Sequence, residues 1–301
     1  MGQSYMLDIA RDSARSDRVT GGRIVKGQLE PGDGDIKITI NIPSFQMTLW
    51  QSGKEIKTYP IGVGMKEFPV YIGRLRAASV EWNPVWIPPS SDWIEASSTV
   101  KPGEIVLPTD PRNPLGKVKI PLGYGYLIHQ AKGPGDMGSL VSHGCIRVMQ
   151  PDLYDLAEKI IAARGLDMTP EKIALAKSNK VNVVLPVDPP IPVEITYDTM
   201  VVESGRLHVY PDVYELRKNT TANLRRELEL DGIGGHSITD TAAKRVFALA
   251  SGRRQFSIST SDIESGQILS KGQVVPIVNI QPATKPQLVR PTSKSRRAAI
   301  R

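Results

Sequence analysis

An alternation of apolar and polar residues begins after Asp35 and constrains the fold of this chain more than any other feature. Its apolar positions are Ile36, Ile38, Ile40, Ile42, Phe45, Met47 and Leu49. A period of two places these side chains on one face of an extended chain, which predicts strands buried on one side. Ser52 and Gly53 then interrupt the pattern before Ile56 and Thr58, which is typical of a hairpin. We therefore expect a mainly β domain that begins at Asp35.

The segment between Pro151 and Gly165 has the spacing of an amphipathic helix. Its apolar residues recur at helical intervals: Leu153, Leu156, Ala157, Ile160 and Ile161. Pro151 suits the first turn of a helix, and Gly165 suits its end. The sequence thus predicts one prominent helix after residue 150.

Shifts in composition divide the rest of the chain. Breakers and polar residues predict a flexible lead segment over 1–34, followed by the main domain over 35–186. A Pro-rich link and further strand patterns predict a strand extension over 187–218 that packs on this domain. Leucines set among charges predict a small helical appendage over 219–260. The ending, rich in Pro, Lys, Arg and Ser, predicts a basic, disordered tail over 261–301.

The segment Trp82–Pro89 holds two tryptophans and three prolines in eight residues. Proline at this density excludes a helix interior and a central strand, so we expect an ordered loop. Two interpretations stay open for it. The loop is anchored by the buried indoles of Trp82 and Trp86, or it forms an apolar wall of a substrate cleft.

The composition, with 40% hydrophobic and 23% charged residues in 301, is that of an ordinary globular chain. No stretch approaches the roughly 18 consecutive apolar residues of a membrane-spanning helix, so we expect no integral membrane segment. The start, Met1–Met6, lacks the apolar core of a signal peptide, and no signal sequence is visible.

The net charge of +7 is concentrated at the end of the chain. Residues 281–301 contain six basic side chains and no acidic one, so the rest of the chain is nearly neutral. We therefore expect no nucleic-acid face on the folded part. The alternative is that the tail binds an anionic polymer of the envelope or nucleic acid.

The single cysteine, Cys145, excludes an intrachain disulfide and lies in an informative setting. His143 precedes it by two residues and His129 by 16. A nucleophilic thiol needs a nearby base or a positive field, and histidine supplies either. Gly144 permits a positive φ, which would let backbone N–H groups point at a developing oxyanion, and Arg147 adds positive potential.

A zinc site is the alternative use of the same residues. Cys145, His129 and His143 are three residues of the types that bind zinc, but a structural zinc site normally has four protein ligands. Because the chain has no second cysteine, we expect no zinc site. We also expect no cofactor.

His129 and the segment Ser142–Val148 resemble the signature of the L,D-transpeptidase catalytic domain, of the YkuD or ErfK/YbiS type. Further similar segments occur in the order of the family: Tyr59–Gly64, Pro69–Gly73, Trp82–Pro89, Asn113–Gly116, Leu127–His129 and the helix after Cys145. The resemblance covers residues 35–186 and implies a β-sandwich-like catalytic domain. Two departures bear on substrate detail: Val70–Gly73, where many relatives have Thr-Pro-x-Gly, and Gln130, where many have Gly.

The resemblance implies a peptidoglycan L,D-transpeptidase that forms 3→3 cross-links. Cys145 is then the nucleophile, and His129 donates and accepts the proton. His143 shapes the motif loop, and the backbone N–H groups of Gly144 and Cys145 bind the oxyanion. A thioester forms on Cys145 with release of D-Ala, and an amine resolves it. Candidate substrate-binding residues are Ser142, Arg147, Trp86 and Tyr126; Arg147 either orients the motif loop or meets a substrate carboxylate.

The implied partners are peptidoglycan stem peptides, with an amine-bearing lipoprotein as one candidate acceptor. The implied location is the cell envelope or periplasm. If water replaces the amine, the enzyme is an L,D-carboxypeptidase or hydrolase. A catalytically weak peptidoglycan-binding module is the non-enzymatic alternative, although both the thiol and the base are present. A papain-like hydrolase places its cysteine before its histidine, which is the opposite order.

Overall fold

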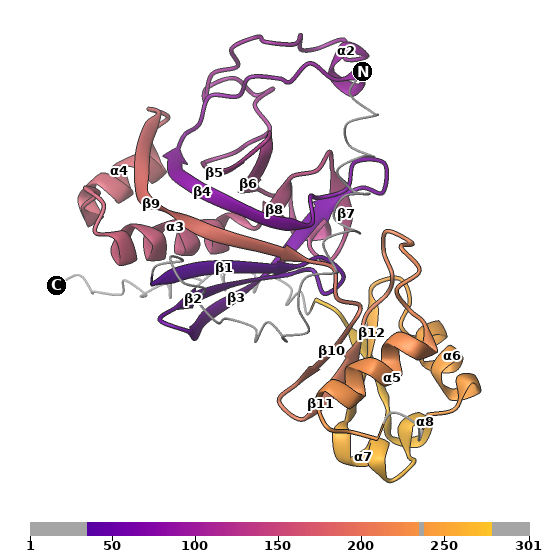
Figure 1. Ribbon diagram of the computed structural model, residues 1–301. Coiled ribbons are helices and arrows are strands. Elements are labelled where there is room, and N and C mark those ends of the chain that lie inside the picture. Colours follow the sequence, from indigo (N-terminus) through magenta and orange to yellow (C-terminus); the bar gives the residue numbers. More distant parts are fainter. Residues whose placement is uncertain (1–34, 235–237, 279–301) are drawn as a thin grey trace, which may run out of the picture.

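The computed structural model describes residues 35–234 and 238–278. The chain forms two units, each with its own sheet and apolar core (Figure 1). Residues 35–196 form the larger unit, and residues 199–278 form the smaller one, called the C-terminal unit below. In these two described ranges, no helix is both long and apolar enough to cross a membrane.

The larger unit is built on one mixed sheet. Its strands are β1 (Ile36–Asn41), β2 (Gln46–Gln51), β3 (Lys54–Gly64), β4 (Gly73–Trp82), β5 (Val118–Gly123), β6 (Tyr126–Gln130), β7 (Leu140–Ser142), β8 (Ile146–Val148) and β9 (Val183–Thr196). Their order is β2-β1-β9-β4-β5-β6-β8-β3-β7, and β2 also pairs with β3. The sheet therefore closes on itself, and the expected mainly β fold is confirmed.

The alternating residues that opened the sequence pattern line the interior of this sheet. All seven, from Ile36 to Leu49, are at most 2% exposed. Strands β1 and β2 are antiparallel, with Ile36 opposite Gln51, and β2 continues into the expected hairpin with β3. A period of two thus directs each apolar side chain to the same side of the pleat.

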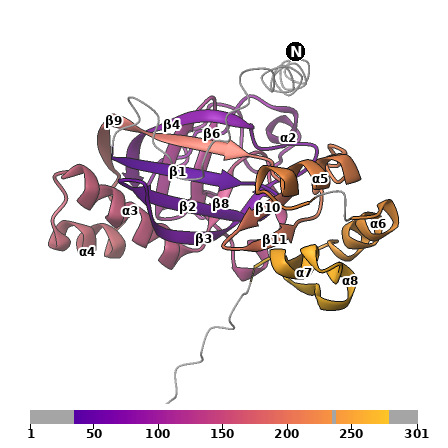
Figure 2. The same cartoon turned by 60° about the horizontal axis from the view of Figure 1, so that its bottom comes forward.

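Helix α3 (Gln150–Arg164) is the helix that the sequence predicts. Its five predicted apolar residues are buried in the main core, and Gly165 ends it in the left-handed conformation with φ +58°. Helix α4 (Pro170–Ser178) follows, with the Thr169 side chain capping its first turn. Figures 1 and 2 show both helices on the same side of the larger unit.

A lobe of residues 83–117 lies between β4 and β5. It contains the short helix α2 (Asp92–Glu95), a bridge between Trp86 and Val106, and a small core of its own. That core consists of Ile94, Val100 and Val106, with Trp86 and Trp93 packed against it. In Figure 1 the lobe lies above β5 and β6.

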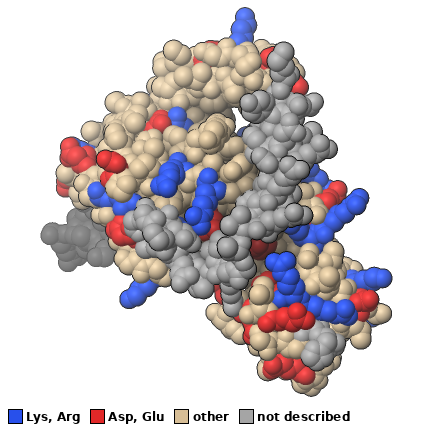
Figure 3. Space-filling model, viewed as in Figure 1, with Lys and Arg blue, Asp and Glu red and all other residues tan. Residues whose placement is uncertain are grey.

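In its described residues, the C-terminal unit combines a four-stranded antiparallel sheet with four helices. Its elements are β10 (Met200–Glu203), β11 (Arg206–Val209), α5 (Thr221–Leu230), α6 (Asp240–Leu249), β12 (Arg254–Ser259), α7 (Thr260–Glu264), α8 (Ile268–Lys271) and β13 (Gln273–Pro276). The helices and the sheet share one apolar core. In the view of Figure 3, acidic and basic side chains are interspersed over this unit.

This arrangement differs from the sequence-based division of the chain. The expected strand extension over 187–218 is split, because residues 187–196 belong to β9 while β10 and β11 join the second sheet. The expected appendage over 219–260 contains helices α5 and α6 but also β12, which lies inside that sheet.

The expected tail over 261–301 also needs correction. Residues 261–278 form α7, α8 and β13, because Ile263 and Ile268 are buried in the core of the C-terminal unit and Ile277 in that of the larger unit. The remainder of the predicted tail and the predicted lead segment over 1–34 lie outside the described residues.

Candidate active site

His129 and Cys145 come together through the parallel pair β6 and β8. Ile128 lies opposite Ile146, and His129 lies opposite Arg147. Both isoleucines are buried in the main core, so His129 and Arg147 point to the other face of the sheet. Cys145 comes two residues before Arg147 and therefore shares that face. The predicted base and the predicted nucleophile thus lie on one face of two neighbouring strands.

A break in the β6–β8 ladder gives the sulfur a hydrogen-bond donor. The Ala131 N–H donates to the Val148 carbonyl at 2.8 Å. Alternate residues of a parallel strand face the same neighbour, so the N–H of Leu127 faces β8 as well. Gly144, with φ +101°, turns the chain out of this ladder. The Leu127 N–H meets the Cys145 side chain instead, and this contact favours the thiolate.

The thiol is nevertheless held in its protonated form. Burial raises the pKa of Cys145 above its ordinary value, whereas the Leu127 backbone and the Arg147 guanidinium act in the opposite direction. Cys145 is therefore a thiol at neutral pH, and its activation requires a base.

His129 has the properties of such a base. Its side chain is only 5% exposed, and burial, followed by the positive charge of Arg147, lowers its pKa to about 4. The Gln130 backbone and the Asp136 carboxylate oppose this shift, and Lys132 adds to it. The imidazole is thus neutral at pH 7. Its Nδ1 is buried and has no hydrogen-bond partner among the described residues.

Arg147 is held by an acidic residue that the sequence interpretation missed. Its Nη1 lies 3.1 Å from Oδ2 of Asp136, and the two side chains are 11% and 13% exposed. The same carboxylate oxygen accepts the Lys132 N–H at 2.9 Å. Asp136 lies in the 3₁₀ helix η1 (Pro134–Asp136), in a Gly- and Pro-rich loop without a sequence signal for this role. Of the two expected roles of Arg147, the ion pair favours orientation of the loop.

A hydrogen bond between two of its own residues holds the 142–145 turn. Ser142 is buried, and its hydroxyl donates to the Cys145 carbonyl at 2.5 Å. A Cβ atom added to Gly144 would come within 3.3 Å of the Tyr126 ring. Tyr126 thus lies beside the turn. Ser142 holds the turn itself.

His143 lies between two aromatic rings. It stacks on Trp93 of the lobe, with 4.1 Å between ring centroids and 9° between planes. The Phe68 ring meets it edge-on, with centroids 4.7 Å apart. Burial, followed by the charges of Arg147 and Lys132, lowers the His143 pKa. Trp93 and Phe68 were not singled out in the sequence, because single aromatics in loops carry no periodic signal.

The two tryptophans that the sequence did single out lie elsewhere. Trp82 is fully buried and stacks on Tyr154 of α3, with centroids 5.5 Å apart. Trp86 is half-buried and packs inside the lobe. The burial of Trp82 favours the interpretation of an anchored loop, and Trp86 packs against the same small core as Trp93, the ring that stacks on His143.

Residues 35–183 match the family model of the YkuD L,D-transpeptidase catalytic domain. This chain carries a YkuD domain. The matched segment contains His129, Cys145 and every other candidate residue described above, and it ends before the C-terminal unit.

Curated relatives of the YkuD domain agree in sequence over a similar length. The "Probable L,D-transpeptidase YbiS" of Escherichia coli K12 is 31% identical over 126 residues, which cover 40% of this chain and 41% of that protein. The "Probable L,D-transpeptidase ErfK/SrfK" of Salmonella typhimurium is 29% identical over 129 residues, which cover 41% and 40%. The match thus spans about two fifths of the length of these relatives.

Solved structures similar to this chain include L,D-transpeptidases. The catalytic domain of the E. faecium enzyme acylated by ertapenem is 18% identical, with a TM-score of 0.33. That match covers 56% of this chain and 99% of the other. An L,D-transpeptidase from Mycobacterium smegmatis is 18% identical, with coverages of 54% and 58% and a TM-score of 0.32.

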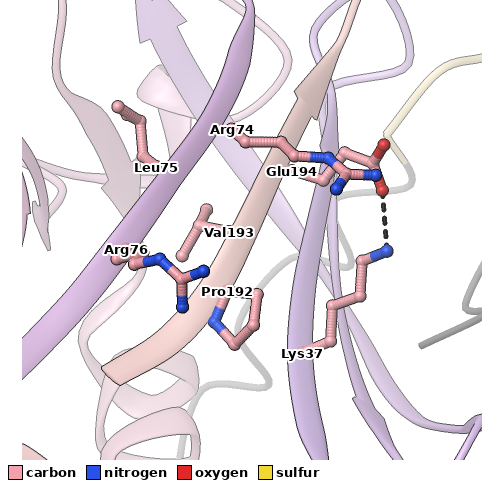
Figure 4. Close-up of a pocket in the computed structure, with 7 residues that line it drawn as sticks. All are labelled: Lys37, Arg74, Leu75, Arg76, Pro192, Val193 and Glu194. Atoms are coloured by element: carbon pink, nitrogen blue, oxygen red, sulfur yellow. Dashed lines mark ion pairs between the residues drawn. The ribbon is translucent and has the colours of Figure 1, made fainter. Parts of the chain in front are cut away.

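Two further features complete the description of the YkuD domain. Across residues 35–234 and 238–278, no three His, Cys, Asp or Glu side chains gather as a metal site, so the three ligands of the zinc alternative do not form one. A pocket on the sheet is lined by basic residues of β1 and β4 and by Glu194 of β9 (Figure 4). Its Lys37 and Glu194 form an ion pair of 2.8 Å.

Proposed function

We propose that this protein is a cysteine-dependent L,D-transpeptidase acting on peptidoglycan stem peptides. The observation that carries the proposal is the placement of His129 and Cys145 on one face of β6 and β8, with a neutral imidazole whose buried Nδ1 has no partner among the described residues. A thiol with a raised pKa needs a proton acceptor, and this nitrogen is available for the proton.

The acylation step follows from these groups. His129 takes the proton from the Cys145 sulfur, which attacks the carbonyl carbon of the third residue of a tetrapeptide stem. The C–S bond forms, and negative charge develops on the carbonyl oxygen. The N–H groups of Gly144 and Cys145 are suited to bind this oxyanion, since neither donates to another residue in the described part of the chain. The C–N bond then breaks, and His129 returns the proton to the nitrogen of the leaving D-Ala.

The second step consumes the thioester. The amine of an acceptor stem attacks the same carbonyl carbon and passes its proton to His129, and the new C–N bond forms a 3→3 cross-link. The C–S bond breaks, and the sulfur regains its proton. An amine-bearing lipoprotein is an alternative acceptor, and water in place of the amine gives carboxypeptidase activity. We place this reaction in the cell envelope, where stem peptides occur.

The test is the intact mass of the purified full chain after exposure to a tetrapeptide muropeptide or a carbapenem. We expect a covalent adduct on the native chain and none on Cys145→Ala. With a muropeptide, the adduct mass should correspond to acylation with loss of D-Ala. Binding without an adduct would instead indicate a catalytically weak peptidoglycan-binding module.

A second comparison tests the assignment of the base. His129→Ala should slow acylation by about 10²-fold or more, since it removes the proton acceptor. His143→Ala should have the smaller effect, since that ring packs between Phe68 and Trp93. If only His143→Ala abolishes acylation, the base is assigned to the wrong histidine.

A further inference from the structure

A buried tyrosine outside the family match reaches the loop beside the candidate nucleophile. Tyr214 follows β11 and is 9% exposed. Its hydroxyl donates to the Gly64 carbonyl at 3.0 Å and accepts the Val70 N–H at 3.2 Å. One hydroxyl group thus connects the two ends of the 64–70 loop, which leads from β3 toward β4.

The 64–70 loop in turn packs on the segment that carries Cys145. A Cβ atom added to Gly64 would lie 3.1 Å from the Gly144 Cα, so the two backbones touch. The Phe68 ring packs edge-on against His143.

A hydrogen bond adds to this packing. The Met65 N–H donates to the Ser142 carbonyl at 2.9 Å. The Ser142 hydroxyl in turn donates to the Cys145 carbonyl. The 64–70 loop thus contacts the turn through a backbone hydrogen bond and through the packing of Phe68 on His143.

The turn that contains Tyr214 has a second link to the loop. Lys66 and Glu215 form an ion pair on the surface. Tyr214 itself contacts Tyr197 in two ways. The two rings stack with centroids 5.5 Å apart, and the Tyr214 N–H donates to the Tyr197 hydroxyl at 2.7 Å. The Tyr197 hydroxyl donates to Asp212 at 2.6 Å. The turn is therefore fixed by a stacked ring and two hydrogen bonds on the side of Tyr197.

We propose that Tyr214 is a positioning residue for the Cys145 nucleophile: its hydroxyl holds the 64–70 loop, and this loop holds the 142–145 turn. The role of Tyr214 in turnover rests on the proposed function, but its effect on the thiol does not. With this role of Tyr214, part of the active site lies in a segment beyond residue 183, where the family match ends.

The change Tyr214→Phe tests this proposal, because it removes the hydroxyl and keeps the ring. The matched control is Tyr59→Phe. Tyr59 is fully buried, and its hydroxyl donates to Asp155 at 2.8 Å, away from the 64–70 loop. Two rates are measured on the full chains: acylation by a carbapenem and alkylation of Cys145 by iodoacetamide across pH. Because Cys145 is the only cysteine, every alkylation event reports on it.

We expect Tyr214→Phe to slow acylation about tenfold and to move the pH profile of alkylation, since small displacements of a nucleophile have large effects on rate. Tyr59→Phe should leave both rates equal to those of the native chain. Rates that are unchanged in Tyr214→Phe, or equally changed in both variants, would overturn the proposal. If the native chain is not acylated, the proposed function fails, while the alkylation profiles still decide the role of Tyr214.

A surface variant covers the case in which Tyr214→Phe does not fold. Glu215→Gln removes the ion pair to Lys66, whose two side chains are 43% and 74% exposed, without touching the core. We expect it to change the alkylation rate of Cys145 about twofold. A rate equal to that of the native chain would contradict the proposed connection.

Discussion

The imidazole of His143 stacks nearly parallel on the indole of Trp93, with ring centroids 4.1 Å apart. Trp93 belongs to α2 of the 83–117 lobe, and His143 precedes Gly144 and Cys145. This pair is therefore a direct contact between the lobe and the turn that carries the candidate nucleophile. The His143 side chain stays partly exposed, and partial burial, followed by the charges of Arg147 and Lys132, lowers its pKa.

Trp93→Ala should raise the pKa of His143 toward its ordinary value of 6.5, because the largest cause of the shift is burial. Trp93→Phe keeps an aromatic surface and should retain most of the shift. NMR titration of the histidine side chains, with His143→Gln to assign the signal, measures both values. The same His143 pKa in native and Trp93→Ala chains would show that the lobe does not bury this ring.

Asp136→Asn should slow acylation about tenfold, because the carboxylate favours the protonated form of His129 and its loss makes proton transfer from the thiol harder. It also leaves Arg147 without its partner, which should lower the free energy of unfolding by about 3 kcal/mol. Urea denaturation and carbapenem acylation measure the two effects.

The control for this change is Glu194→Gln, which breaks the similarly buried pair with Lys37 at the pocket of Figure 4. We expect a comparable loss of stability with unchanged acylation. Equal losses of acylation in both variants would mean that Asp136 acts only through general stability.

His129 should make the stability of the fold depend on pH between about 4 and 6.5. Its folded pKa lies below its unfolded value, so the unfolded chain binds the proton first as the pH falls. The free energy of unfolding should therefore decrease below pH 6.5 and level off below about 4, by about 3 kcal/mol in total. His129→Gln should lack this part of the dependence. Parallel curves for the two chains, measured by urea denaturation at each pH, would contradict the assignment.

Gly144→Ala should abolish most acylation, because φ is +101° and the new Cβ would press on the Tyr126 ring at 3.3 Å. Gly125→Ala is the matched control. Gly125 also has a positive φ, of +83°, but a Cβ there meets nothing within 4 Å. Both variants should lose about 1 kcal/mol of stability from backbone strain, and only the first should lose acylation. Equal acylation in both would exclude a role for the Gly144 turn.

Much of the larger unit could be predicted from local patterns. The alternation that begins at Ile36 and the helical spacing after Pro151 each report a buried face directly, because side-chain direction repeats with the backbone. The last part of the C-terminal unit, from β12 to β13, was not predicted. Its strand β12 buries Phe256 and Ile258 but is flanked by charged residues and followed by short helices, so its pattern is too brief to stand out from a tail.

Some residues of the candidate site could likewise be predicted from a local motif, and others could not. Cys145, His129 and Gly144 could be singled out because each has a distinctive chemistry within a short motif. Trp86 was expected near the substrate and packs inside the lobe, whereas Trp93 from the same lobe meets His143. Both tryptophans lie in the 83–117 lobe, which is mostly irregular. Sequence spacing there does not reveal which of the two rings contacts the 142–145 turn.

The sequence by itself therefore determined the alternating strands that begin at Ile36, the helix after Cys145 and the chemical identity of the candidate nucleophile and its candidate base. Only the tertiary structure decided that Asp136 meets Arg147, that Trp93 covers His143 and that Tyr214 holds the 64–70 loop. The reason is physical: a periodic pattern records which face of one element is buried, while contacts between distant loops depend on how the closed sheet brings their ends together.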